Sequence, residues 1–291
     1  MIIDKQEDVT RAVLDEMHRT PDARTREILS ALVKHLHAFI REVKLTEREF
    51  QEAIGILNAI GQNTTPSHNE AMLMAGALGV SNLICLLNNG LKGTRPTQAN
   101  NLGPFYRAGA PRCDNGASIV RSPTPGPALY FSGSVRDLDG RAIAGATVEV
   151  WHPSPVGLYE NQDATQAEMN LRGRFTTDAN GAFSFRSVKP SGYPVPTDGP
   201  TGALLRAQKR HNFRPAHLHF LIHKPGFKTI ASQVYDPSDP HLQTDSQFGV
   251  TRALIGNFQK NGDEYSLEFT FVLEPGESWL PQAPITQKVA A

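Results

Sequence analysis

The chain has 291 residues, 29 basic and 29 acidic side chains, and a formal net charge of zero. This length is enough to bury a sizeable core in one large domain or in two smaller ones. A neutral balance argues against a general nucleic-acid binder or a binder of anionic membranes. Two cysteines, Cys85 and Cys113, are too few for a disulfide framework or a thiolate zinc site.

The N-terminal segment, residues 1–11 (MIIDKQEDVTR), is charged and lacks the apolar core of a signal peptide. No apolar run in the sequence approaches the length that spans a membrane. We therefore expect a soluble protein of the cytoplasm with reduced cysteines, and neither nucleic acid nor membrane among its partners.

Residues 1–100 are expected to be helical. Thr20 and Pro21 provide an N-cap and a proline at the first helical position, and apolar residues then recur at helical spacing through residues 28–43. This stripe indicates core packing or contact with a partner helix, and it carries no chemistry by itself.

Two capping boxes predict two further helices. Thr46 with Glu49 precedes one apolar stripe, and Ser67 with Glu70 precedes another that ends near Gly90. The helical region therefore consists of several helices joined by short connections.

Residues 101–291 are expected to be mostly β. Short β-like runs cover residues 129–137, 146–153, 173–178, 182–188, 217–223 and 266–274. Asp139-Gly140 and Asn180-Gly181 lie between successive runs and are typical of hairpin turns. Many short strands with frequent turns indicate an antiparallel β-sandwich or barrel. The predicted fold is thus an N-terminal helical region followed by a β-sandwich domain.

One β-like run carries two histidines, His217 and His219, in the segment RPAHLHF (214–220). Residues two apart in a strand face the same side, so both imidazoles share a face and Leu218 points into packing on the other. A solvated pair of histidines is the plain alternative. The apolar flanks favour burial, and a metal ion is an economical partner for two buried imidazoles.

The usual zinc patterns are absent, and no carboxylate flanks the pair, although Asp236 and Asp239 lie downstream. Two loop tyrosines are further candidates, Tyr159 and Tyr193. Either one alone is more typical of a core edge, but phenolate oxygen is a hard anionic ligand suited to iron(III). From the residues alone, both interpretations stay open.

Several segments in this order resemble the intradiol ring-cleaving dioxygenases, in the branch of hydroxyquinol and catechol 1,2-dioxygenases. They are GPFYRAGAP, GLYENQD, MNLRGRF, SGYPVPTDGP, RPAHLHF and the spaced Gln233, across residues 100–255. The resemblance implies a β-sandwich with one mononuclear non-haem iron(III) per chain. It also implies a homodimer formed through the N-terminal helices, with a lipid between subunits as a further option for a stripe that contains Leu73, Leu83 and Ile84.

The resemblance also assigns roles at the implied iron. Tyr159 and His217 match the equatorial ligands, and Tyr193 and His219 match the axial ones. Arg214 matches the arginine that lies over the substrate ring, and Gln233 matches the glutamine beside it. The residues implied to line the substrate pocket are Leu73, Gly76, Asn101, Leu102, Gly103, Pro104, Phe105, Val195, Pro196 and Gln247.

The implied reaction inserts both atoms of dioxygen and opens an aromatic ring between two hydroxylated carbons. Tyr193 leaves the metal and accepts a substrate proton, which is general-base work by a ligand. Arg214 stabilises negative charge that develops on the ring, and its guanidinium stays charged throughout.

Hydroxyquinol (1,2,4-trihydroxybenzene), which yields maleylacetate, is the first choice of substrate, because YPVPTDGP and NLRGRF resemble that branch. Catechol or a substituted catechol, which yields a cis,cis-muconate, is the second. Gly76 departs from the hydroxyquinol branch, where an acidic residue is expected. Asn101 and Gln247 are polar at positions that are usually apolar, so they are alternative partners for a third hydroxyl.

Two alternative functions, from other classes of protein, remain open. A non-enzymatic β-sandwich binding module shares the strand pattern but does not need two tyrosines and two histidines together. A zinc hydrolase would use His217 and His219 as ligands, and metal analysis separates it from an iron dioxygenase.

Overall fold

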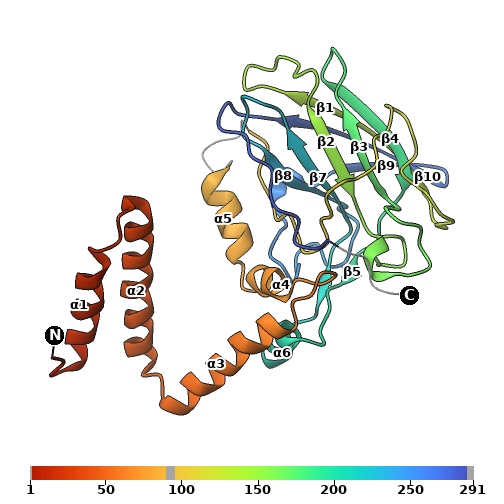
Figure 1. Ribbon diagram of the computed structural model, residues 1–291. Helices are drawn as coiled ribbons and strands as arrows, with labels where there is room; N and C mark the ends of the chain where they lie inside the picture. Colours follow the sequence, from red (N-terminus) through yellow and green to blue (C-terminus); the bar gives the residue numbers. More distant parts are fainter. Residues whose placement is uncertain (1, 90–95, 287–291) are drawn as a thin grey trace. The chain divides into compact units, whose positions relative to one another are not determined.

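The structure is a computed structural model that describes residues 2–89 and 96–286 (Figure 1). The expected helix end at Gly90 lies outside the described residues. The chain divides into two compact units, Met1–Asn58 and Ala59–Ala291.

The first unit contains α1 (Gln6–Met17), α2 (Ala23–Val43) and most of α3 (Glu47–Gln62). Asp22 rather than Thr20 caps α2, because its carboxylate accepts a hydrogen bond from the backbone N–H of Thr25 at 2.6 Å. The predicted N-cap was therefore two residues early.

The capping box at the start of α3 forms as expected. The backbone N–H of Thr46 donates to Glu49 at 2.8 Å, and the backbone N–H of Glu49 donates to the Thr46 hydroxyl at 3.3 Å.

The second unit begins with the end of α3, followed by α4 (Glu70–Ala77) and α5 (Val80–Asn88). The sequence predicted one continuous helix here, but Gly79 adopts a left-handed conformation (φ 73°) and the axes bend by 76°. No single helix among the described residues is long and apolar enough to cross a membrane; α4 and α5 meet the length and composition criteria only as this bent pair.

The predicted capping box of Ser67 with Glu70 is wrong. Asn69 caps α4 by accepting from the backbone N–H of Met72 at 2.8 Å. The Glu70 carboxylate is instead buried, where it accepts from the backbone N–H of Thr201 at 2.7 Å and contacts His68. Thr201 lies in the first turn of α6 (Pro200–Ala207), so this carboxylate ties α4 to a helix N-terminus.

Two four-stranded sheets form the predicted sandwich (Figure 1). One has the order β4 (Ala182–Val188), β1 (Ala128–Arg136), β10 (Glu264–Val272), β9 (Asn257–Asn261), and the other has the order β3 (Arg172–Thr176), β2 (Thr147–Trp151), β7 (His217–His223), β8 (Ile230–Tyr235). Neighbouring strands are antiparallel except β1 and β10, which pair in parallel, so the first sheet is mixed. A short ladder joins β5 (Tyr193–Pro194) to β6 (Phe213–Arg214), and η1 (Glu160–Gln162) and η2 (Arg252–Leu254) are 3₁₀ turns.

The core between the two sheets is rich in aromatic side chains. Phe131 of β1 stacks on Phe185 with ring centroids 4.8 Å apart, and it meets Phe220 of β7 at 5.0 Å. Leu218 belongs to the same buried cluster. One face of β7 is therefore anchored in the core by dispersion and apolar burial.

Both predicted hairpin turns form, but the strands that flank them do not pair with each other. Gly140 and Gly181 adopt the positive φ that such turns require, but β1 and β2 lie in different sheets, and so do β3 and β4. Ile143 and Ala146, in the connection from β1 to β2, are buried in the core between the sheets. The chain therefore turns back only briefly at these points, as in the antiparallel bridge of Arg136 with Ala142, and then continues into the other sheet.

The predicted helical region of residues 1–100 extends past the division between the compact units at Asn58/Ala59. Its last helices, α4 and α5, contact each other, and α4 packs against α6 of the β-rich unit. The helices that follow residue 58 thus help to build the wall of that unit.

Candidate active site

The two histidines of β7 lie on the face of the sheet that points away from the aromatic core. Both are buried, at 0% and 1% exposure, and their Nε2 atoms are 3.0 Å apart. Leu218 and Phe220 occupy the opposite face, as the alternation in RPAHLHF predicts. The strand therefore holds both imidazoles at fixed neighbouring positions.

A row of four side chains crosses this face of the sheet. Trp151 is in register with Arg172 on one side and with His219 on the other, and His219 is in register with Gln233. The Trp151 indole stacks on the His219 imidazole with centroids 4.7 Å apart and an interplanar angle of 8°. This stacking restricts the orientation of the His219 ring.

The two tyrosines reach the same place from separate loops. Tyr159 immediately precedes η1, and Tyr193 lies in β5. Both are 1% exposed, and their hydroxyl oxygens are 3.4 Å apart. The Tyr193 ring lies 5.6 Å from His217 and the Tyr159 ring lies 6.3 Å from His219, measured between centroids. Two phenols and two imidazoles thus converge in one buried cluster, hereafter the four-ring cluster.

Hydrogen bonding exposes one nitrogen of His217 to this cluster. Its Nδ1 donates to the Pro215 carbonyl at 2.7 Å, which leaves Nε2 as the atom with a free lone pair. Burial, followed by the charge of Arg214, lowers the pKa of His217 to about 3. The pKa of His219 is also well below its ordinary value, mainly because of burial. Both imidazoles are neutral, which is the form that binds metals.

Burial changes the pKa of the Tyr159 phenol in the opposite direction. It raises the pKa of Tyr159 well above the ordinary value, and neighbouring Tyr193 raises it further, while Arg214 and Arg172 act against these effects. A phenolate at this position therefore needs an additional cation close to its oxygen.

Arg214 is fully buried beside the four-ring cluster. Asp245 accepts from its Nε and Nη2 in a bidentate pair, at 3.0 Å each, and Nη1 lies 3.2 Å from Nε2 of His217. Nη2 also donates to Gln233 and to the Tyr235 hydroxyl, at 2.9 Å each. Burial alone would lower the pKa of Arg214, but Asp245 and the neighbouring groups raise it, so the guanidinium stays charged.

Three residues of this network were missed by the sequence analysis. Asp245 holds Arg214, Tyr235 joins Arg214 to Gln233, and the side chain of Asn100 donates to Tyr235 and to the carbonyl of Gly249. A weak signal existed for Tyr235, because in QVYDP it is two residues after Gln233 and shares its strand face. No local pattern marks Asp245.

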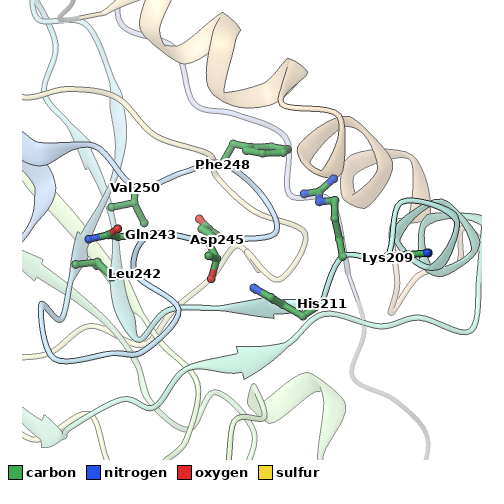
Figure 2. A pocket seen from close by; sticks show the side chains of 9 residues that line it. Lys209, His211, Leu242, Gln243, Asp245, Phe248 and Val250 are labelled. Atoms are coloured by element: carbon green, nitrogen blue, oxygen red, sulfur yellow. The ribbon is translucent and has the colours of Figure 1, made fainter.

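Asp245 also lines a cavity of about 730 Å³ (Figure 2). Its wall includes Lys209, Arg210, His211 and Phe248, and the Arg210 guanidinium lies 4.5 Å from the centroid of the Phe248 ring. Asp245 thus lines this cavity and also pairs with the buried guanidinium of Arg214.

Most of the expected pocket residues lie near the four-ring cluster. One apolar cluster contains both tyrosines together with Leu73, Leu102, Phe105 and Val195. Gly103 packs its backbone on His219: an added Cβ would be 3.1 Å from Cε1 of the imidazole, and its φ of 79° suits glycine. Pro104 is buried between Gly103 and Phe105, and Pro196 is half-buried beside Val195.

The polar pocket residues have defined contacts. The Asn101 carbonyl accepts from the Gln233 amide at 2.7 Å, and the Gln247 side chain covers Gly76 of α4. A Cβ at position 76 would lie 1.8 Å from Oε1 of Gln247, so glycine is what gives that amide its space.

Among the described residues, no three His, Cys, Asp or Glu side chains form a group that fits a metal ion. The four-ring cluster supplies two imidazole nitrogens and two phenol oxygens instead. Two donors that bind one metal at about 2.1 Å and at right angles lie about 3 Å apart, which matches the separation of the two Nε2 atoms. This mixed set of neutral nitrogen and anionic oxygen donors fits a ferric ion.

Two family models and several known proteins match this chain. Residues 102–275 match the family described as "Dioxygenase", and residues 22–94 match "Catechol dioxygenase N terminus". A 6-chlorohydroxyquinol 1,2-dioxygenase of Cupriavidus pinatubonensis is 40% identical, with 93% of this chain and 98% of that protein covered. A hydroxyquinol 1,2-dioxygenase of a Rhizobium species is 36% identical, with 92% and 95% covered.

Solved structures show the same relationship. Hydroxyquinol 1,2-dioxygenase from Pseudomonas putida superposes with a TM-score of 0.83 at 34% identity, over 93% of this chain and 99% of that one. Catechol 1,2-dioxygenase from Pseudomonas arvilla superposes with a TM-score of 0.79 at 32% identity, over 95% of this chain and 93% of that one. The chain therefore belongs to the intradiol ring-cleaving dioxygenases, in the branch of the hydroxyquinol and catechol 1,2-dioxygenases.

Proposed function

We propose that this enzyme opens the ring of hydroxyquinol between its two adjacent hydroxylated carbons, using dioxygen and an iron(III) ion held by the four-ring cluster. The observation that carries this proposal is the convergence of Tyr159, Tyr193, His217 and His219 in one buried place on the sheet. A binding module has no need of that arrangement.

Iron(III) would be held by the two phenolate oxygens and the two Nε2 atoms. Two phenolates and two neutral imidazoles leave a ferric ion with a single positive charge, which suits a buried site. The ion would act as a Lewis acid that binds the diol and draws electron density from its ring. The residues around it supply proton transfer, positioning and exclusion of water.

Tyr193 is the proposed proton acceptor. Its hydroxyl contacts Tyr159 at 3.4 Å, and it lies in the two-residue strand β5, which pairs only with the equally short β6 among the described strands. A ligand on a short ladder is easier to displace than one in the middle of a sheet, such as His219. Tyr193 therefore takes up a proton from the substrate at its phenolic oxygen when the diol binds.

Arg214 is the proposed electrostatic catalyst. Asp245, Gln233 and Tyr235 fix its guanidinium from one side, so that Nη1 points toward the four-ring cluster. A donor fixed before the reaction stabilises charge on the substrate ring without further reorganisation. Gln233 positions Arg214 in this arrangement.

The choice of hydroxyquinol rests on the polar wall of the pocket and on relatives named for that substrate. A third ring hydroxyl needs a partner, since a buried hydroxyl without one costs about 1–3 kcal/mol. Gln247, which is 4% exposed, and Asn101, at 7%, carry buried side-chain amides. Catechol, without that hydroxyl, is the second candidate.

Oxygen uptake with hydroxyquinol, 6-chlorohydroxyquinol, catechol and protocatechuate tests the proposal. We expect the highest kcat/KM with one of the two hydroxyquinols and formation of the ring-opened acid. A preference for catechol would replace the substrate but keep the reaction. A preference for protocatechuate would overturn the branch, because a ring carboxylate needs a different pocket.

Replacing Gly76 by alanine is expected to reduce selectivity for hydroxyquinol over catechol about tenfold. The new Cβ displaces the Gln247 amide, and losing one hydrogen bond to a buried hydroxyl has this magnitude. Alanine is also the better helix former, so α4 itself is not weakened. The ratio of the two kcat/KM values is the measurement.

The matched control is Gly55→Ala in α3, where an added Cβ meets nothing within 4 Å. It should leave the ratio unchanged. An unchanged ratio in folded Gly76→Ala enzyme would contradict the role given to Gln247.

We also propose that the N-terminal helices join two copies of the chain. One side of α2 exposes a stripe of apolar side chains, each about half accessible: Ile28, Leu32, Leu36, Phe39 and Val43. Leu32→Glu should convert a dimer to monomers in light scattering, whereas Lys34→Glu should not. A monomeric parent protein, or a dimer that Leu32→Glu leaves intact, would contradict the proposal.

A lipid between the subunits is a further proposal. Leu83 and Ile84 of α5 are more than half exposed and suit an acyl chain, but Leu73 is fully buried beside the tyrosines and is excluded from such a surface. Mass spectrometry of an organic extract of the purified protein tests this proposal.

A further inference from the structure

Arg172 of β3 is a buried cation that the proposed reaction does not use. It is 1% exposed and stands in the cross-strand row next to Trp151, which in turn stacks on His219. Its guanidinium carbon lies 5.9 Å from the centroid of the Tyr159 ring, within the range of a cation–π interaction.

Only one of the three guanidinium nitrogens of Arg172 has a polar partner among the described residues. Nη2 bonds to Glu160 at 3.0 Å and to Asn161 at 3.2 Å, whereas Nε and Nη1 are buried without one. Unpaired buried donors on a charged group are costly. The electron-rich ring of Tyr159 is the neighbour that offsets this cost.

The charge of Arg172 is held in place from the residue next to Tyr159. Glu160 is fully buried and bridges Arg172 to Arg107, whose other Nη bonds to Glu168 at 2.6 Å. The bonds to Glu160 and Asn161 also tie the backbone after Tyr159 to β3. Arg172 is thus fixed relative to both the ring and the chain that carries it.

We infer that Arg172 is a positioning residue for Tyr159, which holds the ring from behind and weakens the donation of electron density from its phenolate to the metal. This inference rests on the proposed function. A fixed positive charge 5.9 Å from the ring centroid would lower the energy of the phenolate electrons that Tyr159 donates to a bound metal. An iron(III) ion held by Tyr159 would therefore stay a stronger Lewis acid toward the substrate.

The test uses the iron-loaded enzyme and its variant Arg172→Met. We expect the phenolate-to-iron absorption band to move to longer wavelength, because the donor electrons rise in energy without the cation. The kcat/KM for hydroxyquinol should fall roughly tenfold, in line with one desolvated cation–π contact. Arg172→Lys, which keeps the charge, should show a smaller shift of the band and a smaller loss of kcat/KM.

The matched control is Arg107→Met, which removes a cation from the same network. Arg107 bonds to the other carboxylate oxygen of Glu160, and among the described residues the cation–π contact with the Tyr159 ring is made by Arg172, so loss of Arg107 should leave the band where it is. Should Arg172→Met fail to fold, the double variant Arg172→Met/Glu160→Gln removes both charges of the pair and replaces it in the comparison.

The outcomes separate the two proposals. An iron-bound Arg172 variant with the band and kcat/KM of the parent overturns the inference and leaves the proposed function standing. A shift of equal size in Arg107→Met also overturns it, because the effect would then belong to the whole network. A parent enzyme without the band or without ring cleavage removes the proposed function and the inference together.

Discussion

Replacing Tyr193 by phenylalanine is expected to reduce turnover of hydroxyquinol by about 10²–10⁴-fold, the usual effect of losing a general base. The ring still fills its place in the apolar cluster, so the fold should persist. The lost atom is the oxygen that, in the proposed mechanism, would bind the metal and receive the substrate proton. Stopped-flow kinetics of substrate binding should show the slowed step, with circular dichroism as the check of folding.

Tyr106→Phe is the matched control. Tyr106 is also buried, and its hydroxyl bonds to Glu149 at 3.0 Å rather than to the four-ring cluster. It should retain full turnover. If Tyr193→Phe turned over within a factor of two of the parent enzyme, proton transfer to Tyr193 would have to be abandoned.

The second large effect is expected for Arg214→Lys, which should lower kcat by about 10²–10³-fold, as for other fixed donors at developing charge. Lysine keeps the charge but has one ammonium group, which does not reproduce the planar contacts with Asp245, Gln233 and Tyr235. Steady-state kinetics should show the loss mainly in kcat.

The same change should lower the melting temperature, because the Asp245 carboxylate is buried and loses its bidentate partner. Arg206→Lys on α6, where the guanidinium donates to a backbone carbonyl, serves as the control and should change neither quantity. A lysine variant with parental kcat would show that the charge alone is sufficient and that the planar geometry of the guanidinium is not required.

Local patterns predicted the parts of the fold that short-range rules decide. The alternation in RPAHLHF places His217 and His219 on one face, and the capping box of Thr46 with Glu49 starts α3. Which strands pair with each other in a sheet was not predictable in this way. The turns at Gly140 and Gly181 are correct locally, but whether the next strand pairs with the last one depends on core packing around Ile143 and Ala146.

In the site, too, the contacts that depend on the folded chain were not predictable from local patterns. The resemblance named the four rings, Arg214 and Gln233, and the structure brings them together. Asp245 was missed, because it lies on a loop 31 residues after Arg214 and its role exists only once the chain has folded. The break at Gly79 was missed because an apolar stripe continues on both sides of the glycine.

The most direct measurement is metal analysis of the purified protein combined with oxygen uptake on hydroxyquinol in the presence of ¹⁸O₂. We expect one iron per chain, a visible absorption band from phenolate to iron, and both labelled oxygen atoms in the ring-opened product. A colourless protein that contains zinc, or an iron protein that leaves hydroxyquinol and oxygen unconsumed, would contradict a ferric centre held by Tyr159, Tyr193, His217 and His219.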